Sequence, residues 1–284
     1  MKGIDIAKWN PVTDYALVAK QVDFAVLKII NKQNNEDSLF STHLQGCRAN
    51  GIPILGVYNY SYAETAAKAR ADATAVINTL KKHDLNTIVW LDVEEEEIAR
   101  RLKSILIDVI FAYKETIEAA GYTFGIYTGM YYYKTHIQPY IQAIEHIPLW
   151  IARYPSSSPM TIAQDPIASK KPDIVDMVAW QYSSKGQIAG IKGNVDLDIS
   201  YLSYEEIEKF KQPYDPNARP ILRKGDRNEY VRSWQTLLNI NGYNCGTTDG
   251  WFGDKTEDAL IRWQQDHGIE AGYVGPQTWK TLEN

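Results

Sequence analysis

Residues 87–94 read TIVWLDVE, an apolar run that ends in two carboxylates. Side chains alternate across a β-strand, so we expect Asp92 and Glu94 on one face, together with Trp90. At about 3.3 Å per residue their Cα atoms lie roughly 6.6 Å apart, which allows the carboxyl separation of either a retaining or an inverting glycosidase. The pair therefore predicts acid–base chemistry at the end of a strand. The structural alternative is an acidic strand end before a helix whose first turn attracts anions, which residues 95–97 fit well.

The length and composition favour one large folded domain and one small one: 284 residues, 44% hydrophobic and 23% charged. Aromatic residues make up 12% of the chain. This is a weak sign of carbohydrate binding, because such rings can stack on sugar faces. The net charge of -5 and the lack of a dense Lys/Arg cluster argue against nonspecific binding of nucleic acid.

Cysteine and histidine usage predicts neither a disulfide framework nor a metal site. Cys47 and Cys245 are far apart in the chain, so we expect free thiols, with Cys47 packed on a helix. The five histidines, among them His83, His136 and His146, show no metal-ligand spacing, and we interpret them as surface or capping residues. We expect no metal and no other cofactor.

The first residues read at once as a strand, and no apolar run approaches transmembrane length. We therefore expect a protein made in the cytoplasm without a signal peptide and with no membrane insertion.

Short strand-like runs alternate with longer helical patterns along the first two thirds of the chain, which predicts an α/β fold. We expect an irregular (β/α)-type barrel of eight strands. The predicted helices are residues 13–20, 38–50, 65–83, 98–120 and a closing helix at 203–210. The predicted strands are residues 2–7, 24–30, 54–60, 87–94, 123–128, 148–153, 177–182 and 195–199.

Polar and aromatic residues stand at the strand ends, where chemistry gathers in such barrels. In a closed barrel the first and last strands are neighbours, so Asp5 and Asp196 should approach each other near Asp92 and Glu94. Carboxyls packed so closely cannot all ionise, and a retained proton is what a general acid needs. The other strand-end candidates are Lys28, Tyr58, Tyr60, Tyr127, Trp150, Arg153, Tyr154, Gln181, Tyr182 and Asp198.

A second, smaller unit follows a proline-rich break. Three prolines within residues 211–220 predict a linker between a domain at 1–210 and a module at 221–284. The module shows a small all-α pattern of three helices. Trp234 and Trp263 recur at helical spacing with aliphatic residues, so we expect both in its core.

Seven short motifs in residues 1–210 resemble glycoside hydrolase family 25, the Chalaropsis-type lysozymes. They are GID at 3–5, GVYNY at 56–60, WLDVE at 90–94, GIY at 125–127, LWIARY at 149–154, WQY at 180–182 and VDLD at 195–198. The resemblance implies an irregular barrel that cleaves the β-1,4 bond between N-acetylmuramic acid and N-acetylglucosamine in bacterial peptidoglycan, with net retention.

The same resemblance implies roles for individual residues. Glu94 would be the general acid/base and Asp92 its partner, either as nucleophile or by orienting the 2-acetamido group of the substrate. Asp5 and Asp196 would complete the acidic site. Asp198 stands where the family often has Asn and would accept a hydrogen bond behind the site. Residues expected to bind the substrate are Tyr58, Tyr60, Tyr127, Trp150, Gln181 and Asp198.

Residues 221–284 resemble a three-helix peptidoglycan-binding module, through motifs such as DGWFGDKT at 249–256 and VGPQTW at 274–279. A hydrolase joined to a wall-binding module and lacking a signal peptide resembles a phage endolysin that waits in the host cytoplasm until release, with a bacterial autolysin as the rival. A chitinase-like glycosidase and a noncatalytic wall-binding protein remain alternatives. An amidase would need a metal cluster or a nucleophile, and the sequence shows no such set.

Overall fold

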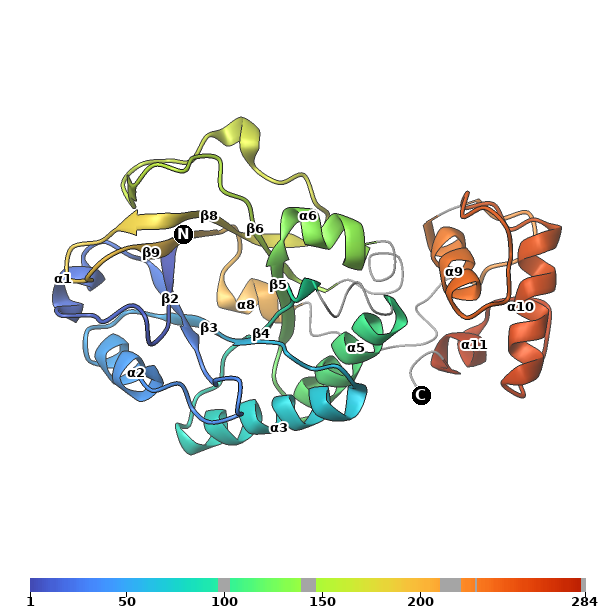
Figure 1. The fold of residues 1–284 in the computed structure, drawn as a ribbon, viewed down its shortest axis with the longest axis horizontal. Coiled ribbons are helices and arrows are strands. Elements are labelled where there is room, and N and C mark those ends of the chain that lie inside the picture. The colour runs from blue at the N-terminus through green and yellow to red at the C-terminus, as the bar shows by residue number, and fades with distance from the viewer. Residues whose placement is uncertain (97–102, 139–146, 210–220, 228, 282–284) are drawn as a thin grey trace.

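The computed structural model describes residues 1–284 except 97–102, 139–146, 210–220, 228 and 282–284. Its larger part is an eight-stranded barrel with helices around it, as the sequence predicted (Figure 1). The strands follow the order β1-β2-β3-β4-β5-β6-β8-β9, and β9 pairs again with β1. They are β1 (Lys2–Ile6), β2 (Phe24–Lys28), β3 (Ile54–Tyr60), β4 (Val89–Asp92), β5 (Phe124–Gly129), β6 (Leu149–Ala152), β8 (Met177–Gln187) and β9 (Val195–Ser200).

The last barrel strand runs against its neighbours. β9 is antiparallel to both β1 and β8, whereas the other barrel pairs are parallel. The start of β9 therefore meets the end of β1, where chemistry is expected. Two details were not predicted: β8 continues to Gln187, and the two-residue strand β7 (Met160–Thr161) pairs with this extension.

Alternation along β4 separates two apolar layers, as predicted for residues 88–93. Val89 and Leu91 belong to the outer layer under the helices, whereas Trp90 lies in the inner layer of the barrel. Gly56 on β3 and Gly125 on β5 flank the indole ring so closely that a Cβ atom at either position would collide with it. Trp90 therefore fills the space between three neighbouring strands.

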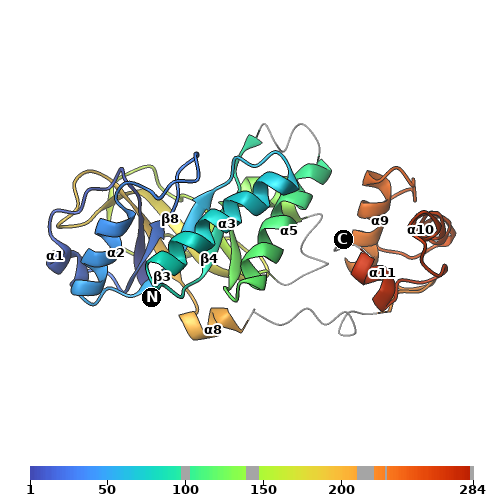
Figure 2. The same ribbon diagram turned by 90° about the horizontal axis from the view of Figure 1, so that it is seen from below.

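The helices pack outside the barrel. They include α1 (Tyr15–Ala19), α2 (Phe40–Ala49), α3 (Ala66–Lys82) and α5 (Lys103–Ala119), and α3 and α5 lie side by side (Figure 2). α8 (Tyr204–Glu208) begins with a capping box and contributes Ile207 to the inner layer. The start of the helix predicted at 98–120 lies outside the described residues. The sequence did not predict α6 (Met130–Tyr132), the π-helix that follows it at Tyr133–Ile137, or the short 3₁₀ helix at Ala168–Lys170.

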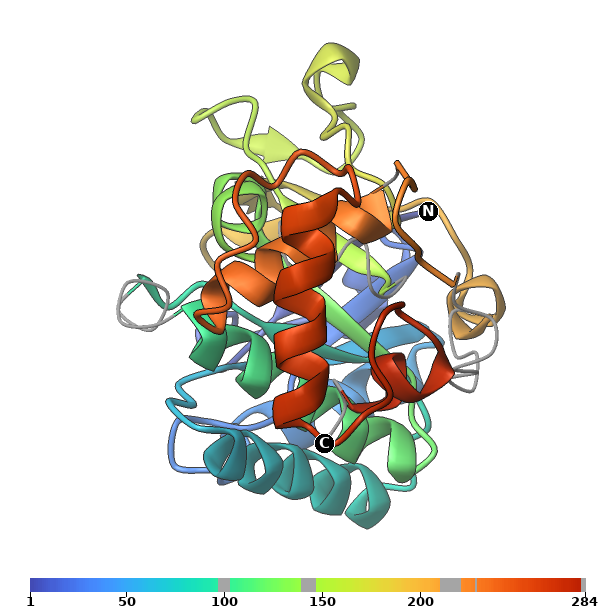
Figure 3. The same ribbon diagram turned by 90° about the vertical axis from the view of Figure 1, so that its right-hand side faces the viewer.

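The C-terminal region forms a helical unit with its own core, drawn in orange to red in Figure 3. Its helices are α9 (Glu229–Ile240), α10 (Asp254–Asp266) and α11 (Pro276–Thr281). Trp234 packs edge-on against Trp263 at 5.1 Å and against Trp279 at 5.4 Å between ring centroids. The prediction that Trp234 and Trp263 are core residues is therefore confirmed.

Two buried glutamines hold the loops of this unit in the same way. The Gln235 amide donates to the carbonyl of Trp251 at 2.9 Å and accepts from the amide N–H of Gly250 at 2.8 Å. The Gln264 amide donates to the carbonyl of Tyr273 at 2.7 Å and accepts from the amide N–H of Gly272 at 2.9 Å. Each loop thus has its backbone polar groups satisfied from the preceding helix.

Candidate active site

Five carboxyl groups meet at the rim where β1 and β4 end and β9 begins, and we call them the acid cluster. Asp5 on β1 lies directly opposite Asp196 on β9, as the barrel closure predicted. Asp92 ends β4, and Glu94 lies two residues beyond it because the strand is shorter than the predicted 87–94. Asp198, on β9, is the fifth member. The structure therefore brings together residues that are far apart in the sequence.

Burial and mutual repulsion favour the protonated forms of these acids. Burial raises the pKa of Asp5 to about 6, although a hydrogen bond from Gln181 opposes the rise. Burial, with the charges of Asp5 and Glu94, raises the pKa of Asp196 to about 8. Burial also raises the pKa of Asp92 well above its usual range, and the charge of Glu94 adds to this effect. The acid cluster thus retains protons at neutral pH.

Glu94 is half-buried, as Asp196 is, and has a defined environment. Burial raises the pKa of its carboxyl, although a hydrogen bond from the backbone N–H of Gly129 opposes the rise. Gly129 ends β5, and a Cβ atom there would lie 3.3 Å from Oε1 of Glu94. The strand next to β4 therefore positions this carboxyl through its backbone. No sequence signal beyond the strand end pointed to Gly129.

Asp5 is held by a hydrogen-bonded chain of side chains. The Gln181 amide donates to Oδ2 of Asp5 at 2.7 Å. Its own oxygen accepts from the hydroxyls of Tyr127 at 2.8 Å and Tyr154 at 2.6 Å. Gln181 and Tyr127 are buried, and their polar groups form hydrogen bonds with other side chains of the protein. The prediction that they bind sugar stays a prediction, and the structure gives them a positioning role.

Asp198 lies behind Asp5, where it accepts a hydrogen bond from the indole N–H of Trp150 at 2.9 Å. This contact fits the expectation of an acceptor behind the site. Burial raises the pKa of Asp198 well above its usual range, and the charges of Asp5 and Asp196 add to this rise. Trp150 is 2% exposed, so its ring packs beneath the acid cluster inside the barrel and does not present a face to a sugar.

The aromatic residues predicted from β3 lie nearer the surface. Tyr58 and Tyr60 are both partly exposed, and the Tyr58 ring packs edge-on against Trp150 at 6.3 Å between centroids. Lys28 ends β2 with its ammonium nitrogen 5.3 Å from the centre of the Tyr58 ring, and its charge lowers the pKa values of Asp5 and Asp92. Lys28 and Tyr154 stood among the predicted strand-end residues, but no pattern in the residues assigned them a role.

One prediction about histidine was wrong. His43 is buried on α2, where Nδ1 accepts from the Tyr15 hydroxyl at 2.8 Å and Nε2 lies 3.2 Å from the carbonyl of Ala7. A helix position that faces the barrel can bury an imidazole when both ring nitrogens find partners. His83 pairs with Glu36 at 3.0 Å. His146 lies outside the described residues.

Among the described residues, no three His, Cys, Asp or Glu side chains are arranged to hold a metal ion. Within the same residues, no helix has the length and apolar character needed to cross a membrane. Cys47 and Cys245 are free and buried, as expected.

The raised pKa of Asp196 predicts a pH-dependent cost to stability. The folded protein holds this proton from about pH 4 to about pH 8, a range in which the unfolded chain has lost it, so the group lowers stability as pH rises. We expect Asp196→Asn to raise the free energy of unfolding at pH 8.5 by on the order of 2 kcal/mol and to change it little at pH 4. Urea denaturation at both pH values measures this. An equal effect at both would contradict the raised pKa.

A barrel with acids gathered at one rim is the arrangement expected of a glycoside hydrolase. The model of the glycosyl hydrolases family 25 matches residues 4–191. The chain belongs to glycosyl hydrolase family 25. A peptidoglycan binding domain family matches residues 227–282. Both matches agree with the resemblances in the sequence.

Relatives of this family 25 protein include an uncharacterized protein, YegX of Escherichia coli O157:H7. It is 28% identical over 222 residues, which cover 73% of this chain and 72% of YegX. The chain is also 25% identical over 271 residues to an autolytic lysozyme of Clostridium acetobutylicum, a match that covers 95% of this chain and 74% of the relative. The second match extends through the C-terminal unit.

Two solved structures share the family 25 barrel. The modular autolysin LytC of Streptococcus pneumoniae, in complex with a synthetic peptidoglycan ligand, matches with a TM-score of 0.58 and 25% identity, over 70% of this chain and 46% of LytC. The chain thus spans less than half of that longer protein. The catalytic domain of endolysin ply40, from a bacteriophage of Listeria monocytogenes, matches with a TM-score of 0.55 and 26% identity, over 74% of this chain and 97% of the domain.

Proposed function

We propose that this family 25 protein is an N-acetylmuramidase that hydrolyses the β-1,4 bond between N-acetylmuramic acid and N-acetylglucosamine in peptidoglycan. The observation that carries the proposal is the acid cluster, in which Glu94 is half-buried with a raised pKa beside Asp92. A family 25 barrel and a peptidoglycan-binding unit in one chain support this choice of substrate.

Glu94 is the proposed general acid. Burial favours its protonated carboxyl, which donates to the glycosidic oxygen as positive charge develops at the anomeric carbon. The pKa values of Asp5 and Asp196 are both raised, that of Asp5 to about 6 and that of Asp196 to about 8, so Asp5 is the first of the two to ionise. An ionised Asp5 stabilises the positive charge of the transition state.

Asp92 has two possible parts in a retaining reaction. It can attack the anomeric carbon, or it can orient the substrate's 2-acetamido group so that the amide oxygen attacks. The pKa of Asp92 is raised by burial, and its Oδ1 atom has no hydrogen-bond partner in the described part of the chain. A carboxyl that tends to hold a proton is a poor nucleophile, and an oxygen without a partner is available to accept from the N–H of the acetamido group. These two observations favour the substrate-assisted route, with net retention.

Mass spectrometry of fragments from purified walls tests the proposal, because the sugar at the new reducing end identifies the bond cleaved. We expect N-acetylmuramic acid at that end, released at least tenfold faster from walls than from chitin. N-acetylglucosamine at the reducing end would identify a glucosaminidase, and preferred cleavage of chitin would support the chitinase alternative. Release of free amines without reducing ends would identify an amidase, and no products at all would support a noncatalytic binding protein.

A further inference from the structure

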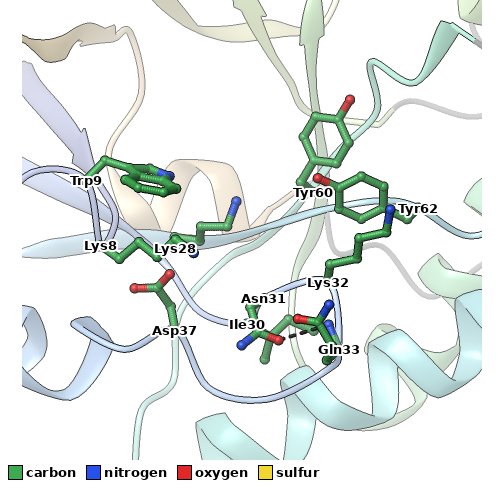
Figure 4. A pocket seen from close by; sticks show the side chains of 10 residues that line it. All are labelled: Lys8, Trp9, Lys28, Ile30, Asn31, Lys32, Gln33, Asp37, Tyr60 and Tyr62. Carbon is green, nitrogen blue, oxygen red and sulfur yellow. Dashed lines mark hydrogen bonds between the residues drawn. The ribbon is translucent and has the colours of Figure 1, made fainter.

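A basic pocket lies at the ends of β1, β2 and β3 (Figure 4). Its volume is about 290 Å³. Three lysines and three aromatic residues line it, namely Lys8, Lys28, Lys32, Trp9, Tyr60 and Tyr62. Lys28 and Tyr60 belong to the rim of the candidate active site as well, and the charge of Lys28 acts on Asp5 and Asp92, so the pocket adjoins the acid cluster.

The lysines of the basic pocket keep their charge available for a ligand. In the described structure, none of the three ammonium groups has a carboxylate within 4.0 Å. Each lies over an aromatic ring instead, Lys8 at 4.5 Å from the Trp9 ring centre and Lys32 at 4.4 Å from that of Tyr62. Trp9 is 74% exposed, which is unusual for so large an apolar side chain unless it meets a partner.

The loop that carries Lys32 is fixed before any ligand arrives. The Asn31 side chain accepts from the backbone N–H of Gln33 at 2.9 Å and of Asn35 at 3.2 Å. Asn34, with φ of 60°, donates from its amide to Asp72 on α3 at 2.6 Å. A loop held in this way loses little conformational entropy on binding.

The basic pocket also contains one acceptor. Asp37 is 2% exposed, lines the pocket and points toward Lys8 (Figure 4). Its Oδ1 accepts from the backbone N–H of Leu39 at 3.2 Å, and its Oδ2 has no partner among the described residues. A ligand that suits this pocket therefore carries a negative charge for the lysines and an N–H group for Asp37.

We propose that the basic pocket binds a free carboxylate, with its neighbouring amide N–H, of the stem peptide attached to muramic acid. The inference rests on the proposed function, because only that substrate brings a peptide close to the scissile bond. The peptide combines both required groups, whereas the phosphates of wall polymers carry a charge without an adjacent amide. Lys8 and Lys32 would contact the carboxylate, and the exposed face of Trp9 would cover the peptide.

The test compares two substrates and three proteins. Native walls, and walls whose peptide carboxylates are converted to amides with carbodiimide and ammonia, are given to the unaltered protein, to Lys8→Gln/Lys32→Gln, and to the control Lys81→Gln on the exposed side of α3. We expect amidation to lower kcat/KM of the unaltered protein and the control about tenfold. The double variant should lose about tenfold on native walls and nothing further on amidated walls.

The proposal would be overturned if amidation lowered kcat/KM of the double variant by a further tenfold. It would also be overturned if the double variant lost no activity on native walls. Walls stripped of phosphate polymers provide a separate arm: a tenfold loss there, and none on amidation, would assign the pocket to phosphate. Calorimetry with a free stem tetrapeptide needs no turnover. Peptide binding that the double variant lacks, in a protein that does not cleave walls, would support the pocket and refute the muramidase. Wall cleavage whose rate does not change on amidation would support the muramidase and refute the proposed role of the pocket.

Discussion

Glu94→Gln should lower kcat on purified walls by about 10²–10⁴-fold and leave wall binding unchanged. Glutamine has nearly the shape of glutamic acid and can keep the hydrogen bond from the Gly129 backbone through its amide oxygen. It cannot give up a proton to the leaving sugar. The loss should therefore fall on kcat, because the proton moves only in the transition state.

Reducing-end release and sedimentation with insoluble walls measure the two quantities separately. Glu96→Gln is the matched control, because Glu96 is exposed two residues further along and outside the acid cluster, and we expect it to keep full activity. A Glu94→Gln variant within threefold of the unaltered protein would show that another member of the acid cluster supplies the proton.

The second large effect concerns the barrel interior. Trp90→Ala should lower the free energy of unfolding by about 3–5 kcal/mol, because it removes a fully buried indole and leaves a cavity between Gly56 and Gly125. Neither glycine has a side chain that could move into the space. We expect the loss in urea denaturation followed by circular dichroism, with the slope on denaturant unchanged.

Trp90→Phe provides the comparison for this prediction. The indole N–H of Trp90 is buried and has no hydrogen-bond partner in the described residues, so phenylalanine removes an unsatisfied donor together with part of the ring. We expect Phe to cost less than half as much as Ala. Equal costs for the two variants would mean that the indole N–H has a stabilising partner.

Most of the barrel could be predicted because its signals are local. The alternation in residues 88–93 predicted which side chains lie on each face of β4. The position of the acids at strand ends predicted that they gather at one rim of the barrel. The pairing of Asp5 with Asp196 followed from closure alone. The resemblance to family 25 then supplied roles that no pattern in the residues could supply.

Features that depend on distant partners could not be predicted. The direction of β9 and the presence of the short β7 depend on the strands with which they pair. Those partners lie elsewhere in the chain, so the local sequence does not determine the pairing. Burial is a similar case, because Trp150 looks like a stacking residue until Asp198 is seen to accept its N–H. His43 is a third example, since its two hydrogen-bond partners come from other elements.

Closure of the barrel by β9 has a consequence for how the protein is made. A nascent chain that ends before β9 already carries Asp92 and Glu94, but it lacks Asp196 and Asp198. The acid cluster is then incomplete, and pairing β9 with β1 requires closing a loop of most of the domain. The acid cluster would therefore be completed late in synthesis of the barrel, after strands β1 to β8 have left the ribosome.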